Sequence, residues 1–107
     1  MVDDVIFAVS LEGYLFVINN QSGNIIRITD IFNQMNKKKR SKIEPVGFIV
    51  GSKNIYLTTD HGRLMIIDII SGRTKSILKI DNDKISRPFV LNQNLYIIQK
   101  NSIIRLN

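Results

Sequence analysis

The chain of 107 residues contains no cysteine and no tryptophan, and it has only one histidine and two prolines. The lack of cysteine excludes disulfide bonds and thiolate metal ligands. A protein metal site needs several grouped ligands, and no such group accompanies the single histidine, His61. No nucleophile elbow and no phosphate-binding glycine loop are present either. We therefore expect no catalytic, cofactor-binding or metal-binding residues, and we predict that the protein is not an enzyme.

Long hydrophobic runs are also missing from the sequence. The longest apolar stretches are far shorter than the roughly 20 residues of a transmembrane helix. Asp3 and Asp4 occupy the place where a secretory signal would carry basic residues, so the first residues do not have the pattern of such a signal. The net charge is +6, which permits contact with an acidic protein or an anionic surface. The cellular compartment stays open.

A repeat with an offset of 49 residues is the strongest feature that is present. Gly13 and Gly23 lie ten residues apart, as do Gly62 and Gly72, and residues 5–23 and 54–72 share one pattern of apolar and turn residues. Residues 94–107 form a third copy that is one residue shorter at its turn. Repeats of about 40–50 residues built from short strands are typical of propeller blades.

Four strand positions recur along the chain, and the first repeat lacks the first of them and the last repeat lacks the fourth. The pattern predicts ten strands at 5–9, 14–18, 24–29, 45–50, 54–59, 63–67, 73–80, 88–91, 94–99 and 103–106. We expect Gly13 and Gly62 to occupy turns that need a positive φ. The fold class is therefore all-β, a partial β-propeller of about two and a half four-stranded antiparallel blades. One domain, 1–107, is expected, with blade units at about 4–30, 45–80 and 87–107 and a basic insertion at 31–44.

The third strand position of each repeat does not alternate between apolar and polar residues. Such runs are typical of strands that are covered on both faces, as in stacked blades, although a buried helix is the competing interpretation. The runs predict buried side chains at Leu15, Val17, Ile18, Leu64, Ile66 and Ile67. Aromatic residues also recur in register, and we expect a core role for Phe7, Phe16, Phe48, Phe89, Tyr14, Tyr56 and Tyr96 rather than a ligand-stacking surface. One helical turn is expected around Ile31, Phe32 and Met35.

Polar clusters offer few candidate sites. Asp3 with Asp4, Asp60 with Asp68, and Asp81 with Asp83 are interpreted as turn residues that accept backbone hydrogen bonds, and His61 as a turn residue. The basic run in the insertion supplies the only partner-binding candidates, namely Lys37, Lys38, Lys39, Arg40 and Lys42. This run is either a solvated loop or a contact for an acidic protein or anionic membrane surface. Nucleic acid is disfavoured because no interleaved aromatics accompany the run.

The repeat resembles that of the quinoprotein-type (PQQ-like) propellers, in which an aromatic residue, an Asp-Gly turn, an apolar strand and an Asp-x-x-Thr-Gly motif follow one another. The matching residues in the second repeat are Tyr56, His61, Gly62, Leu64, Ile67, Asp68, Ser71 and Gly72, and in the first repeat Phe7, Glu12, Gly13, Leu15, Ile18, Asn19, Ser22 and Gly23. The family's blade-docking tryptophan falls near Arg27 and Ser76, and its paired cysteines are absent. Both departures point away from the catalytic members.

The resemblance implies a non-catalytic scaffold for protein interactions, similar to the BamB-like component of outer-membrane protein assembly, and a location on the periplasmic face of that membrane. A fragment of a PQQ-dependent dehydrogenase and a cytoplasmic adaptor that binds an acidic partner are the alternatives. We expect this chain to be the C-terminal portion of a larger propeller. Its open blade edges would then meet the missing blades of the parent chain or pair by self-association.

Overall fold

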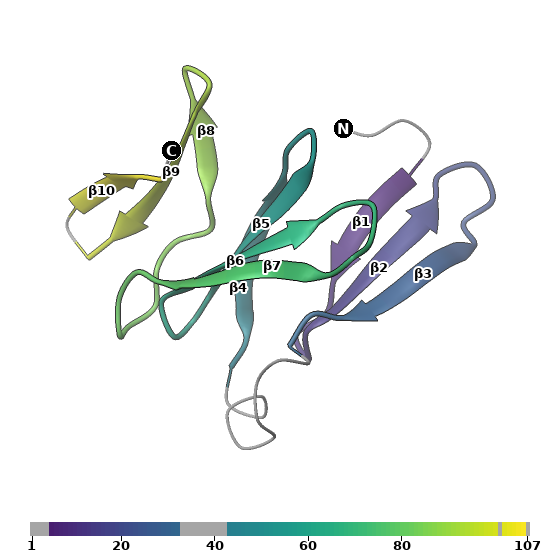
Figure 1. Cartoon of the computed structure of the whole chain (residues 1–107), viewed down its shortest axis with the longest axis horizontal. Coiled ribbons are helices and arrows are strands. Elements are labelled where there is room, and N and C mark those ends of the chain that lie inside the picture. Colours follow the sequence, from purple (N-terminus) through teal and green to yellow (C-terminus); the bar gives the residue numbers. More distant parts are fainter. Residues whose placement is uncertain (1–4, 33–42, 101, 107) are drawn as a thin grey trace.

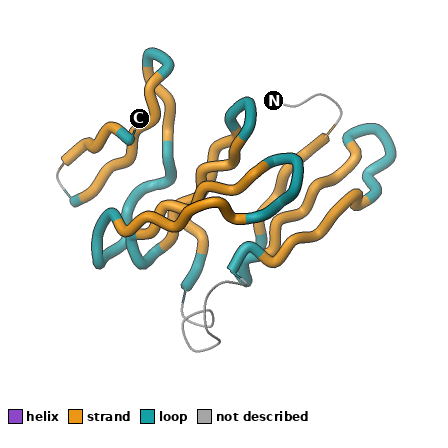
Figure 2. Tube along the Cα trace, in the orientation of Figure 1, coloured by secondary structure: helices purple, strands orange, loops and turns teal. Residues whose placement is uncertain are grey.

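The computed structural model describes residues 5–32, 43–100 and 102–106. Ten strands run through these residues, and the described residues between them form turns and loops (Figures 1 and 2). The strands are β1 (Val5–Val9), β2 (Tyr14–Asn19), β3 (Ile25–Asp30), β4 (Pro45–Val50), β5 (Asn54–Thr59), β6 (Arg63–Asp68), β7 (Thr74–Lys79), β8 (Phe89–Leu91), β9 (Asn94–Gln99) and β10 (Ser102–Arg105). The described residues contain no helix with the length and apolarity needed to cross a membrane.

Three antiparallel sheets stand one after another along the molecule (Figure 1). The first sheet has the strand order β1-β2-β3, the second β4-β5-β6-β7 and the third β10-β9-β8. We call them the first, second and third blade. Within each sheet, every strand pairs with its neighbour in the sequence, as expected for a meander. The molecule measures 42 × 38 × 19 Å. The prediction of an all-β partial propeller of about two and a half blades is confirmed.

The predicted strands agree with the observed ones to within one residue at every boundary. One of the one-residue differences is at Pro88, which was expected to open a strand. Strand β8 begins at Phe89, which pairs with Tyr96, and Pro88 lies buried just before it. Proline has no N–H to donate to a neighbouring strand, and it is tolerated at the first residue of a strand, as at Pro45, which opens β4 and pairs with Thr59.

The hydrophobic core lies between the first and second blades. Its buried members are Leu15, Ile31, Phe32, Ile43, Ile55, Leu57, Met65 and Ile67. Strands β5 and β6 contribute the residues of one face by alternation, and Phe7 and Val9 of β1 pack against them. Because Phe32 is fully buried, its truncation to alanine is expected to cost about 3–5 kcal/mol.

Of the residues expected in one helical turn, Ile31 and Phe32 lie in a turn directly after β3, and Met35 lies outside the described residues. The Ile31 N–H donates to the Gly13 carbonyl over 3.0 Å, and Asp30 Oδ1 accepts from the Phe32 N–H at 3.1 Å. These bonds hold the two side chains in the core.

Four of the six side chains predicted to be buried in β2 and β6 are buried, and two are not. Leu15, Val17, Leu64 and Ile67 are at most 7% exposed, but Ile18 and Ile66 are only half-buried. Ile18 lies on the face of the first blade that no sheet covers, and Ile66 borders an open cleft beside the third blade. The run of apolar residues does mark two apolar faces, yet burial of both faces depends on a neighbouring blade.

The aromatic residues expected in the core are mostly half-buried. Tyr14 is 39% exposed, and the other six predicted aromatics have intermediate exposure. Phe7 and Phe48 pack against the core from its margin. The fully buried aromatic is Phe32. The repeat places the other rings near sheet faces, whereas Phe32 comes from a connection, where no periodic pattern indicates burial.

The repeat is preserved in the hydrogen bonds of the turns after β2 and β6. In the first blade, Gly23 N donates to Asn19 O and Ser22 N donates to Asn19 Oδ1, over 2.9 and 3.0 Å. In the second blade, Gly72 N donates to Asp68 O and Ser71 N donates to Asp68 Oδ2, both over 2.8 Å. The offset of 49 residues therefore describes equivalent turns, with Asn and Asp in the same capping role.

A close backbone contact fixes the turn between β5 and β6. Gly62 has a φ of +72°, and a Cβ atom there would lie 2.3 Å from the Asp81 carbonyl oxygen. The Gly62 carbonyl accepts hydrogen bonds from Ile80 N and Asp81 N, over 2.8 and 3.2 Å. The segment after β7 is therefore held against this turn, and no side chain fits between them.

We predict that Gly62→Ala destabilises the protein more than Gly23→Ala. Gly23 has a similar φ of +74°, but its absent Cβ would meet no atom within 4 Å. Gly23→Ala should therefore show only the strain of a left-handed residue, about 1–2 kcal/mol. Gly62→Ala adds a backbone clash and should cost about 3 kcal/mol or more. Equal losses of the free energy of unfolding in urea titrations would contradict the tight contact.

Candidate functional site

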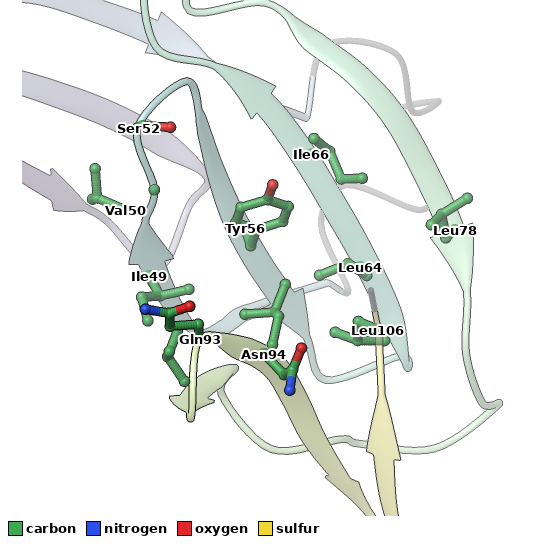
Figure 3. A pocket seen from close by; sticks show the side chains of 13 residues that line it. Ile49, Val50, Ser52, Tyr56, Leu64, Ile66, Leu78, Gln93, Asn94 and Leu106 are labelled. Atoms are coloured by element: carbon green, nitrogen blue, oxygen red, sulfur yellow. The ribbon is translucent and has the colours of Figure 1, made fainter.

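An open cleft of about 460 Å³ lies between the second and third blades (Figure 3). Strands β4, β5 and β6 provide one wall, with Ile49, Tyr56 and Ile66 among the lining residues. The third blade provides the facing wall, with Val90 and Leu95. Because most of the lining is apolar, the cleft exposes hydrophobic surface at the point where two blades meet.

A tight turn between β8 and β9 places two amide side chains at the cleft. Leu91 pairs with Asn94, so only Asn92 and Gln93 form the loop, and both have positive φ values of 51° and 66°. Positive φ at both central residues is the signature of a type I′ hairpin turn. This turn presents Gln93 and Asn94 to the cleft beside Ile49, as Figure 3 shows.

Among the described residues that line the cleft, none has a charged side chain. Its polar side chains are those of Ser52, Tyr56, Gln93 and Asn94, so hydroxyl and amide groups supply all side-chain hydrogen bonding. The Tyr56 hydroxyl lies 3.5 Å from the Asn54 amide nitrogen, which donates to it. Two apolar walls remain accessible, because Leu78 is 45% and Val90 54% exposed. The cleft therefore suits a neutral, apolar ligand that also offers hydrogen-bonding groups.

The two blade interfaces differ because their connections differ. Between the first and second blades, Ile31, Phe32 and Ile43 of the long connection enter the core. The shorter connection between β7 and β8 contributes the buried residues Ile85 and Pro88, neither of which lines the cleft. The interface between the second and third blades consequently lacks connection side chains like those that pack between the first and second blades.

Arg27 fastens the first blade to the second. Its guanidinium donates hydrogen bonds from Nη2 to the Ile69 carbonyl over 2.7 Å and from Nη1 to the Ile70 carbonyl. Both acceptors lie in the turn between β6 and β7. Strand β3 packs closely there, since a Cβ atom at Gly72 would lie 2.7 Å from Thr29 Oγ1. The residue near the position where the quinoprotein repeat has tryptophan thus joins two blades through hydrogen bonds.

The third blade is held to the second by polar contacts. Gln99 Nε2 of β9 donates to Asp81 Oδ2 over 2.7 Å. Ser86, in the connection before β8, receives the Ile98 N–H on its hydroxyl oxygen at 2.7 Å and donates its own N–H to the Ile98 carbonyl over 3.0 Å. These contacts position one end of the cleft without filling it.

His61, Asp60, Asp68 and Asp81 lie in or beside turns, as predicted from the sequence, whereas Asp83 contributes its backbone N–H, which donates to Asp81 Oδ1 over 3.4 Å. His61 Nδ1 lies 2.8 Å from Asp60 Oδ1 in the turn after β5. Asp60, Asp68 and Asp81 accept backbone hydrogen bonds from Glu44, Ser71 and Asn82 respectively, over 2.9, 2.8 and 2.6 Å. The pKa of the Asp68 carboxyl is lowered by the Ser71 hydrogen bonds. Within the described ranges, no three His, Cys, Asp or Glu side chains group as metal ligands.

The partner-binding candidates predicted from the sequence cannot be placed beside the cleft. Lys37, Lys38, Lys39, Arg40 and Lys42 lie outside the described residues, as do Asp3 and Asp4. The cleft residues Gln93 and Asn94 were not predicted as site residues. Their only sequence signal is the short loop between two strands with asparagine at its first position, and that signal predicts a turn rather than a binding site.

Solved structures with the same arrangement of blades are β-propellers. The β-propeller domain of Cps50 (Swd1) from Myceliophteria thermophila is similar with a TM-score of 0.70 and 16% identity, covering 88% of this chain and 31% of that one. The computationally designed proteins Ika4 and Ika8 are similar with TM-scores of 0.71 and 0.69, each at 8% identity. They are matched over 99% and 98% of this chain, and over 61% and 30% of their own chains.

The chain thus spans less than two thirds of each of these structures, and the likeness establishes a β-propeller fold. No family model matches the sequence, and no curated protein matches it.

We predict that Arg27→Ala lowers the free energy of unfolding by about 2–3 kcal/mol, because two hydrogen bonds from a charged donor to backbone carbonyls are lost. Arg73→Ala is the matched control, since Arg73 is exposed, and it should change stability by less than about 0.5 kcal/mol. Urea unfolding of both variants makes the comparison. Similar losses for the two arginines would show that Arg27 does not fasten the blades.

We also predict an acid-dependent contribution from Asp81. The Gln99 side-chain hydrogen bond, followed by the Asn82 backbone N–H, lowers the pKa of the Asp81 carboxyl. An aspartate with a lowered native pKa stabilises the fold above its unfolded pKa of about 3.9, and this stability is lost as the pH falls through the native value. Gln99→Ala should therefore flatten the dependence of unfolding free energy on pH between about pH 5 and pH 2. Gln21→Ala, at an exposed glutamine, should leave it unchanged.

Proposed function

We propose that this protein is a non-catalytic β-propeller scaffold that binds an extended, apolar segment of a partner protein in the cleft between the second and third blades. The observation that carries the proposal is the composition of that cleft, which is apolar, uncharged and edged by hydroxyl and amide groups. Leu78 and Val90 are about half exposed on its walls. Apolar surface left open beside hydrogen-bonding groups is typical of protein interaction sites.

A peptide segment fits the chemistry of the cleft better than a charged small molecule does. Amide side chains both donate and accept hydrogen bonds, so Gln93 and Asn94 complement the N–H and C=O groups of an extended backbone. The apolar walls would receive alternate side chains of the segment, as in other modes of strand-like peptide recognition. No charge in the lining selects for a charge on the ligand.

The same features argue against a quinone-dependent dehydrogenase. Pyrroloquinoline quinone carries three carboxylates, and an uncharged apolar lining supplies no cation to hold them. The position of the blade-docking tryptophan in quinoproteins falls near Arg27, which makes polar contacts to Ile69 and Ile70. A structural rather than catalytic member of the PQQ-like repeat class fits these residues.

Within that class, we propose a scaffold of the BamB-like kind, which would act at the periplasmic face of the outer membrane. Support comes from the repeated turn motif, in which Asp68, Ser71 and Gly72 form the same hydrogen bonds as Asn19, Ser22 and Gly23. The basic run from Lys37 to Lys42 would add electrostatic attraction for an acidic partner. A cytoplasmic adaptor would use the same cleft and the same run.

The proposal predicts a selective loss of peptide binding when one wall of the cleft becomes charged. Random peptides displayed on phage would be selected on the full chain, and the affinity of the enriched peptides measured by fluorescence anisotropy. We expect peptides with alternating apolar residues, whose affinity falls at least tenfold in Val90→Lys. Ile26→Lys is the matched control, because Ile26 is 56% exposed on β3, against 54% for Val90. The Ile26→Lys variant should bind the enriched peptides with the same affinity as the unaltered chain.

A parallel titration with pyrroloquinoline quinone and Ca²⁺ separates the competing function. We expect no quenching or shift of the quinone fluorescence at micromolar protein concentrations. Saturable quinone binding that Val90→Lys abolishes would support the dehydrogenase alternative. Enriched peptides that bind the Val90→Lys and Ile26→Lys variants equally well would overturn the cleft as the binding site.

A further inference from the structure

The outward face of the first blade is apolar and bare among the described residues. The cross-strand pairs Ile6 with Ile18 and Phe16 with Ile28 place these four side chains on one face of the sheet. Arg27, the neighbour of Ile28, points the other way and contacts the second blade. Ile6 is 44% and Ile28 54% exposed. We call this surface, with Ala8, the leading face.

The second blade shows what such a face does when it has a neighbour. At the repeat offset of 49, the residues of the leading face correspond to Ile55, Leu57, Met65, Ile67 and Ile77. The first four of these are fully buried against the first blade. The leading face of the first blade therefore has apolar residues at the positions that, in the second blade, form its interface with the first blade.

The outward face of the third blade has the residues that could pack against the leading face. Its residues are Phe89 and Tyr96, whose rings stack with centroids 5.7 Å apart, together with Ile98 and Ile103. Arg105, which pairs with Tyr96, lies on the same face and adds one cation to it. Ile98 is 45% and Ile103 67% exposed. We call this surface the trailing face. The corresponding face of the second blade, which includes Tyr56 and Leu64, is the one turned toward the third blade. Neither outward face belongs to the cleft of the proposed function.

We propose that the trailing face of one molecule packs against the leading face of a second copy, head to tail. The chain itself supports this occupant, because each blade in it meets the next through a trailing and a leading face. A second copy presents such a pair of faces in the same order. Large bare apolar surfaces on a soluble protein mark interaction sites. Contact between unlike faces is a heterologous interface, which produces a ring or an open chain of copies.

The geometry gives a mixing experiment with a distinctive outcome. Ile28→Lys places a charge on the leading face alone, and Ile103→Lys on the trailing face alone. Every head-to-tail contact uses one face of each kind, so either variant by itself should be monomeric at its mass of 12.3 kDa. An equimolar mixture retains one intact pair of faces and should form a one-to-one dimer of twice that mass. The unaltered chain should be a dimer or larger, measured by sedimentation velocity between about 5 and 200 μM.

Ile70→Lys is the control, because Ile70 is 87% exposed in the turn between β6 and β7, on neither face. It should associate as the unaltered chain does. If circular dichroism shows loss of β-sheet in either test variant, Ile6→Lys and Ile98→Lys provide the same test. A monomeric unaltered chain overturns the proposal, and so does a mixture that stays monomeric. A single variant that remains dimeric would show a two-fold interface instead, and would also overturn it.

Discussion

The fold depends on the packing of one apolar sheet face against the next. A sheet of three or four strands gains stability when a neighbour removes its apolar face from water. Between the first and second blades this cover is complete, with Leu15, Phe32, Ile55 and Met65 fully buried. The turns, the connections and the cleft all take their positions from that contact. The interface between the second and third blades is less completely filled and leaves the open cleft.

Hydrogen bonds at the margins of the blades supplement this packing. The guanidinium of Arg27 reaches two backbone carbonyls of the neighbouring blade, and Gln99 and Ser86 connect the third blade to the second. Polar contacts of this kind are directional, so they fix the angle between blades, whereas apolar contacts tolerate sliding. The tryptophan-free sequence thus joins its blades with an arginine and with amide and hydroxyl groups.

The strands could be predicted from the sequence because the repeat combines periodic apolar residues with glycine turns at a constant offset. Burial was harder to predict. Ile18 and Ile66 lie in apolar runs like those of Leu15 and Leu64, but whether a neighbouring sheet covers them is a property of the assembled blades. Phe32 lies in a connection, so no periodicity indicated its place in the core. The cleft arises from the spacing of two sheets, which no local pattern encodes, and its residues Gln93 and Asn94 gave only a turn signal.

The unequal filling of the two interfaces creates a gradient of stability along the chain. Amide protons exchange with solvent through local openings, and the free energy of an opening rises with the apolar contacts that it breaks. We expect the amides of β5 and β6, which lie against the filled core, to exchange most slowly. Strands β8 to β10 border the open cleft, so we expect them to open first. A ligand bound in the cleft would contact both the second and the third blade. It would therefore raise the free energy of opening of the third blade and slow amide exchange throughout β8 to β10.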